Sequence, residues 1–216
     1  MAKVNAINNK SEELTIDPGA SGDSFVQFDI NGTGEFRIGV DDDASDAFKI
    51  SQGSALGSND CFISTAAGEI TMPLTPAFLM THGTADTNCT GNGTAFTIGS
   101  GNALTEVFDQ NNDMTTGGTF TAPVTGKYAF YIDCFLTGCS AATTGVLAFT
   151  ASNRTLNLNV SRAATSAHFG IQGGCIVDMD ASDTCTFVIT ISGEASDICD
   201  LQGAVSNNWI SGALVT

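Results

Sequence analysis

Hydrophobic and polar residues alternate along most of this chain with a period of two, not with the 3.6-residue period of a helix. In residues 36–40, 128–134 and 185–191 every second side chain is apolar. Alternation of this kind places one face of a strand against a core. Such segments recur about every ten residues with turn residues between them, which is typical of a β-sandwich or jelly roll. The pattern predicts an all-β protein with almost no helix.

The first third of the chain differs from the rest in the length of its predicted strands. Residues 36–40 and 48–50 flank the acidic segment 41–46, a pattern that predicts a hairpin around an acidic turn. From about residue 77 the strands become longer and more apolar. We therefore expect two domains, a small loop-rich β stem or attachment region over residues 1–76 and a jelly-roll knob over residues 77–216.

The strong excess of acidic over basic residues excludes some classes of binding partner. The chain has 216 residues, with 23 Asp and Glu against 7 Lys and Arg, and a net charge of −16. Proteins that bind nucleic acid use Lys and Arg to replace the counterions of the phosphate groups. This chain has too few basic residues to form such a surface, so binding to nucleic acid or to an anionic membrane is not expected. Hydrophobic residues make up 42% of the chain, so a disordered acidic tail is also excluded.

The start of the chain and its cysteines predict the compartment. No apolar run follows Met1, so no secretory signal is expected and synthesis in a cytosol is predicted. Seven cysteines cannot all pair within one chain, and none forms a C-x-x-C motif. We expect free, mostly buried thiols. A Cys134–Cys139 disulfide is the less favoured alternative.

The second part of the chain resembles the complement globular heads, which are jelly rolls of the tumour-necrosis-factor type. Residues 120–130 read FTAPVTGKYAF, similar to the family's F-x-A-P-x-x-G-x-Y-x-F core, and residues 209–215 (WISGALV) are similar to its closing strand. Residues 177–185 match a family loop in which Ser182 stands in place of a glycine. The resemblance covers about residues 100–216 and implies a homotrimer around a threefold axis. The family's collagen stalk is absent, so a complement role is not implied.

The same motifs supply candidate residues for the core or for the trimer contact. The sequence alone leaves these two roles open, because an aromatic stripe on a strand suits both. The candidates are Phe120, Tyr128, Phe130, Trp209 and Leu214.

The first part of the chain resembles connecting segments of phage tail-fibre and virion-surface proteins. The strings carrying this likeness begin at Phe36 (FRIGVDD), Phe48 (FKISQGSALG) and Gly68 (GEITMP). The resemblance implies short, intertwined β segments. A short strand pair cannot bury a thin apolar face alone, whereas three copies around one axis can.

Catalytic and metal sites are not expected. No nucleophile elbow, zinc-protease motif or phosphate loop occurs, and His82 and His168 are expected to be surface or packed residues, with His82 in a loop between the two domains. The acidic segment of Asp178, Asp180 and Asp183 offers weak candidate ligands for a hard cation, although solvated turns and Asx caps are the favoured explanation of these residues. We therefore predict no enzyme activity, no cofactor and no metal.

These observations favour a structural protein of a bacteriophage virion. The first hypothesis is a trimeric capsid decoration or cement protein on the head surface, made in the host cytoplasm and contacting the major capsid protein through its N-terminal region. The alternative is a short tail- or head-fibre knob that binds a host receptor. A secreted lectin-like or cytokine-like module is disfavoured by the lack of a signal peptide.

Overall fold

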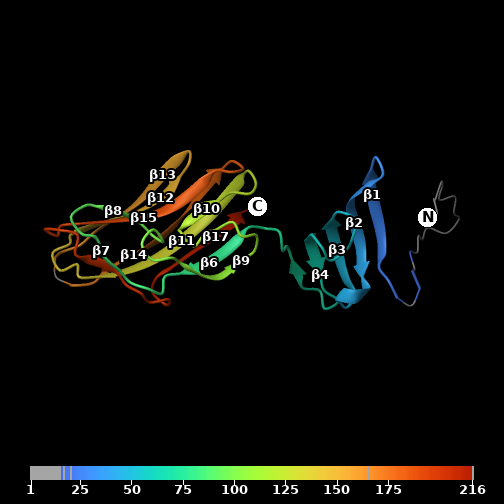
Figure 1. The fold of residues 1–216 in the computed structure, drawn as a ribbon, viewed down its shortest axis with the longest axis horizontal. Coiled ribbons are helices and arrows are strands. Elements are labelled where there is room, and N and C mark those ends of the chain that lie inside the picture. The colour runs from blue at the N-terminus through green and yellow to red at the C-terminus, as the bar shows by residue number, and fades with distance from the viewer. Residues whose placement is uncertain (1–15, 17, 20, 165, 216) are drawn as a thin grey trace. The chain divides into compact units, whose positions relative to one another are not determined.

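The computed structural model describes residues 16, 18–19, 21–164 and 166–215 of the chain, and it confirms the all-β prediction (Figure 1). Within those residues the only helical turn is the 3-10 segment η1 (Asp42–Ala44). No helix there is long and apolar enough to cross a membrane. The chain divides into two compact units, Met1–Leu74 and Thr75–Thr216.

The first unit contains a five-stranded antiparallel sheet in which each strand pairs with the next along the chain. Its strands are β1 (Ser24–Ile30), β2 (Thr33–Asp41), β3 (Ala47–Gln52), β4 (Asp60–Ser64) and β5 (Ile70–Thr71). Asn31 and Gly32 join β1 to β2 with φ values of 52° and 81°. Two positive φ values suit a two-residue hairpin, and Asn-Gly is the pair that adopts them most readily.

The predicted hairpin around the acidic segment is confirmed. β2 pairs with β3 so that Val40 lies opposite Phe48 and Ile38 opposite Ile50. The turn is not wholly solvated, however, because Asp41 is buried at the end of β2, where it accepts a hydrogen bond from Lys49 at 2.8 Å. Every pairing in this sheet is made within one chain, so the expected interweaving of chains stays a prediction.

The second unit is a sandwich of two antiparallel sheets, and its chain path is that of a jelly roll (Figure 1). The chain passes repeatedly from one sheet to the other between β10 and β17. One sheet is built from β8 (Ala95–Thr97), β10 (Thr119–Thr121), β12 (Thr144–Ala151), β13 (Arg154–Ser161) and β15 (Thr184–Ser192). The other is built from β6 (Ala77–Thr81), β7 (Asp86–Thr90), β9 (Thr105–Asp109), β11 (Gly126–Thr137), β14 (Phe169–Met179), β16 (Cys199–Leu201) and β17 (Trp209–Val215).

The core of the jelly roll lies between these two sheets. β11 and β15 alternate buried and more exposed residues along nearly their whole length, as their period-two patterns predicted. All seven cysteines are free thiols, and four of them are buried. The predicted free thiols are therefore confirmed, and the alternative Cys134–Cys139 disulfide is not formed. Burial raises the pKa of the Cys185 thiol to about 12, so this side chain packs as a small apolar group.

Candidate functional site

Three of the five candidate residues lie inside a single chain. Phe120, Tyr128 and Phe130 are each at most 1% exposed, and their rings contact one another at centroid distances between 5.2 and 6.4 Å. The Tyr128 hydroxyl donates a hydrogen bond to the carbonyl of Val124 at 2.6 Å, which satisfies its one polar group. Of the two roles that the sequence left open, the structure gives these residues the core role.

Leu214 packs against the same core and explains the neighbouring glycine. Gly126 is the first residue of β11, and its φ is not in the left-handed region, so no turn conformation requires a glycine there. A Cβ at Gly126 would lie 2.6 Å from Cδ1 of Leu214, closer than side chains approach. A side chain at this position would therefore require Leu214 to move.

The fifth candidate, Trp209, lies on the other side of this sheet. The neighbouring strands of this sheet lie in the order β14, β11, β17, β6 and β9. Their register aligns the residues that point away from the core in three rows. We call this surface the outer face. Its rows are Ile176, Ala129, Ala213 and Ala77; Gly174, Tyr131, Ser211, Leu79 and Phe108; and Gln172, Asp133, Trp209, Thr81 and Thr105.

Tyr131 stands at the centre of the outer face and is 55% exposed. A Cβ at Gly174 would lie 2.4 Å from Cδ1 of Tyr131, so the ring lies over a residue without a side chain. The ring borders two hollows, one of about 410 Å³ lined also by Trp209 and Gln172, and one of about 220 Å³ lined also by Phe108. Tyr131 therefore forms a ridge between two shallow depressions.

Asp133 is the one Asp, Glu, Lys, Arg or His in the three rows of the outer face. It lies directly opposite Trp209 in the β11–β17 pair. Burial raises the pKa of Asp133, and a hydrogen bond from the backbone N–H of Cys134 offsets this only in part. The three rows are thus apolar at their centre and carry one carboxylate toward one end. The next row on the same side of the sheet, at the opposite end, holds Asp178 and Lys127.

Sequence reasoning missed Tyr131, Ile176 and Phe108. Ile176 and Phe108 are 59% and 46% exposed, although both are large and apolar. A signal for Tyr131 was present, because an aromatic residue follows Phe130 directly and so must point away from the core face of β11. No comparable signal marks Phe108 or Ile176, because their exposure depends on which strands flank β11.

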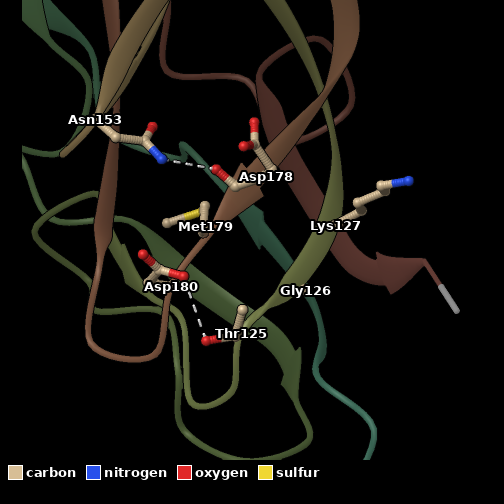
Figure 2. Close-up of a pocket in the computed structure, with 7 residues that line it drawn as sticks. All are labelled: Thr125, Gly126, Lys127, Asn153, Asp178, Met179 and Asp180. Atoms are coloured by element: carbon tan, nitrogen blue, oxygen red, sulfur yellow. Dashed lines mark hydrogen bonds between the residues drawn. The ribbon is translucent and has the colours of Figure 1, made fainter.

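Two of the three acidic candidates, Asp178 and Asp180, line an open pocket of about 270 Å³ beside the β14–β15 turn (Figure 2). Arg154 forms an ion pair with Asp178 at 2.9 Å, and the Thr125 hydroxyl donates to Asp180 at 3.5 Å. Asp183 accepts a hydrogen bond from the backbone N–H of Asp180. Figure 2 shows the Lys127 side chain pointing away from Asp180. In the part of the chain that the structure describes, no three acidic, histidine or cysteine side chains are grouped to hold a metal ion.

The position expected for His82 was wrong. It follows β6 inside the jelly roll, not in a loop between the two units, and it is 1% exposed. Its Nε2 lies 2.9 Å from Oδ2 of Asp86, whose other oxygen accepts hydrogen bonds from Asn102. The other histidine, His168, stacks on Phe135. His82 is thus a packed residue that holds β6, β7 and the loop after β8 together.

Comparison with known proteins identifies fold relatives only. No protein-family model matches the chain, and neither does any curated protein. Among solved structures, the PRD1 vertex protein P5 is 12% identical, covers 76% of this chain and 87% of its own, and has a TM-score of 0.50. The globular domain of zebrafish complement 1qA protein is 17% identical and covers 66% of this chain and 98% of its own, with a TM-score of 0.43. Murine APRIL is 11% identical and covers 65% of this chain and 98% of its own, with a TM-score of 0.46. The likeness to P5 concerns the fold alone.

Proposed function

We propose that this protein is a structural component of a bacteriophage virion, a homotrimeric capsid decoration or cement knob on the head surface. The outer face of the jelly roll is the observation that carries the trimer. The virion assignment rests on the resemblance of residues 1–76 to segments of virion-surface proteins. It is further supported by the fold shared with P5, which is a vertex protein by name.

The composition of the outer face suits contact with protein. Tyr, Trp and Phe are enriched at interfaces and charged residues are depleted from their centres. Here Tyr131, Trp209 and Phe108 share one face with Ile176 and a single carboxylate. An exposed apolar surface of this kind marks an interaction site, because monomeric proteins rarely leave large apolar patches open.

The shape of the outer face suits a ring of copies. A ridge at Tyr131 and two hollows beside it are different surfaces of one chain. Contact between unlike surfaces of identical chains generates a closed ring when the rotation permits it. In the proposed trimer, the Tyr131 ring of each copy enters a hollow of the next. The net charge of −48 for three chains of −16 opposes this association, so added salt is expected to favour it.

Attachment to the major capsid protein is assigned to the N-terminal region, since the trimer occupies the outer face of the jelly roll. The proposed role requires neither a cofactor nor catalysis. The protein would thus lie on the capsid exterior after synthesis in the host cytoplasm.

Copy number in purified virions tests this role. A decoration protein is present in numbers comparable with the major capsid protein, and quantitative mass spectrometry of whole particles measures the ratio. Parity with tail proteins would contradict the decoration role and favour the second candidate, a short fibre knob that binds a host receptor. The polar pocket at Thr125, Asn153 and Asp180 favours that candidate, because it is open to solvent and large enough for a small polar group (Figure 2).

A further inference from the structure

The sheet of the first unit has one face on which large apolar side chains are exposed. Residues directly opposite in neighbouring strands share a face, so the register defines it. Its middle row is Val26, Ile38, Ile50 and Phe62, and its flanking rows are Phe28, Phe36 and Gln52, and Ser24, Val40, Phe48, Ser64 and Ile70. We call these residues the N-terminal apolar face. It contains no Asp, Glu, Lys or Arg.

The opposite face of the same sheet is completed by its own chain. Lys49 lies 2.8 Å from a carboxylate oxygen of Asp41 and 3.0 Å from one of Asp60. Arg37 donates to the Gln27 side chain and lies over the ring of Phe25, 3.9 Å from its centroid. Both basic residues on that side, Lys49 and Arg37, therefore have partners within their own chain.

The open face is large for so small a unit. Val26, Phe28, Phe36, Val40, Phe48 and Ile70 are between 36% and 62% exposed. Together they leave roughly 500 Å² of apolar surface in water, as much as the largest patch on a typical monomer. By contrast, Ala47 and Leu56 are the buried apolar residues of the described part of this unit. A sheet with so little core needs its apolar face covered to be stable.

We infer that two further copies of this chain cover the N-terminal apolar face, so that three sheets turn these faces toward a common axis. The inference rests on the proposed homotrimer. The face of each chain supplies less than the roughly 800 Å² per partner of a standard interface, so the sheets need the jelly rolls to bring them together.

The linker and the charge distribution favour copies of the chain as the occupant. Five residues separate β5 from β6, so each sheet is tethered closely to its own jelly roll. A short tether gives a local concentration in the millimolar range, at which modest apolar faces associate. Residues 1–74 contain 12 acidic and 4 basic residues, a net charge of −8, and none of those in the described part belongs to the rows of the apolar face. Three copies can therefore meet there with their like charges held outside the contact.

The first 15 residues of the same chain are a poorer match for this surface. Their large apolar residues are Met1, Val4, Ile7 and Leu14, spread over a largely polar segment. They cannot supply an apolar surface equal to the three rows of the sheet. The capsid protein is also a poorer occupant, because the first unit would then leave this face open whenever the protein is free of the particle.

Photo-crosslinking of the purified full-length chain tests the inference. The photoreactive phenylalanine p-benzoylphenylalanine replaces Phe28 on the apolar face in one variant and Phe25 on the opposite face in the other. Both positions lie on β1 and both replaced residues are aromatic, so the variants are matched. We expect covalent dimers and trimers from the Phe28 variant, joined to peptides of residues 24–70, and no joined chains from the Phe25 variant.

Three results would overturn the inference, each in a different way. If light scattering gives the mass of three chains but Phe28 joins only its own chain, including the first 15 residues, the packing of the sheets is wrong and the trimer stands. If the mass is that of one chain and no chains are joined, the proposed trimer fails together with the inference. Equal joining from Phe28 and Phe25 would show random collision between tethered units and would also contradict it.

Discussion

Phe130 and Tyr131 are adjacent on β11 but point to opposite faces of the sheet. Alanine substitutions at the two positions therefore distinguish the contribution of the core from that of the proposed trimer contact. Phe130 is fully buried and packs on the rings of Phe78, Phe120 and Phe187 at centroid distances of 6.3, 5.2 and 5.4 Å. Truncating such a residue costs about 3–5 kcal/mol, since it removes buried area and leaves a cavity. We expect Phe130→Ala to lower the free energy of unfolding of the chain by that amount.

Tyr131→Ala should act on association instead. The ring is 55% exposed in a single chain, so its loss changes the stability of that chain by less than about 1 kcal/mol. If the ring is central to the contact between copies, its truncation costs about 2 kcal/mol or more at each contact. A loss of 2 kcal/mol raises a dissociation constant roughly 30-fold.

The two effects are measured separately. Light scattering over a dilution series gives the dissociation of the trimer, and denaturant unfolding at low concentration gives the stability of the single chain. We expect Tyr131→Ala to dissociate at concentrations where the unmodified chain stays trimeric, with almost unchanged unfolding of the monomer. The reasoning is refuted if Tyr131→Ala leaves the association unchanged, or if Phe130→Ala leaves unfolding unchanged.

Three further substitutions test individual parts of the account. Lys49→Met leaves Asp41 and Asp60 as buried carboxylates without their cation, so the first unit should lose about 3–5 kcal/mol, seen as faster hydrogen exchange in β3. Equal exchange in the variant would show that the pair contributes nothing. The pKa of Asp133 is higher in the folded chain than in the unfolded chain, so the ionised carboxylate lowers the free energy of unfolding. This loss of stability is complete above the folded-state pKa. It disappears as the pH falls from the folded-state pKa to the lower pKa of the unfolded chain. Asp133→Asn should therefore raise the melting temperature at neutral pH. The increase in melting temperature on acidification should also be smaller in the variant than in the unmodified chain, and identical pH profiles of the two proteins would contradict this prediction. Ser182 has a φ of 75°, where glycine is favoured, so Ser182→Gly should stabilise the chain by about 1 kcal/mol, measured by denaturant unfolding; a loss of stability would contradict the strain.

The sequence was most informative where one face of a strand is buried. The alternation in residues 128–134 and 185–191 predicted β11 and β15 with their buried sides, because burial selects every second residue. The Ser182 position illustrates the value of the resemblance as well. The loop that residues 177–185 resemble has a glycine there, and Ser182 of this chain has a φ of 75°, a conformation that glycine favours.

The outer face could not be predicted from the sequence, because it depends on long-range pairing. Tyr131, Trp209 and Phe108 come from three strands that become neighbours only through the order β11-β17-β6-β9. His82 was misplaced for a similar reason. Its partner Asp86 lies four residues away in sequence, but its burial depends on the distant loop of Gln202 and on Asn208.

The mass of the purified chain in solution is the most direct test of the proposed trimer. Light scattering behind a sizing column measures it without assuming a shape. The account predicts three chains of 22.2 kDa each, about 67 kDa, with a larger trimer fraction at higher salt. A mass of one chain at all concentrations and salt levels would contradict the trimer, and with it the role assigned to Tyr131 and to the N-terminal apolar face.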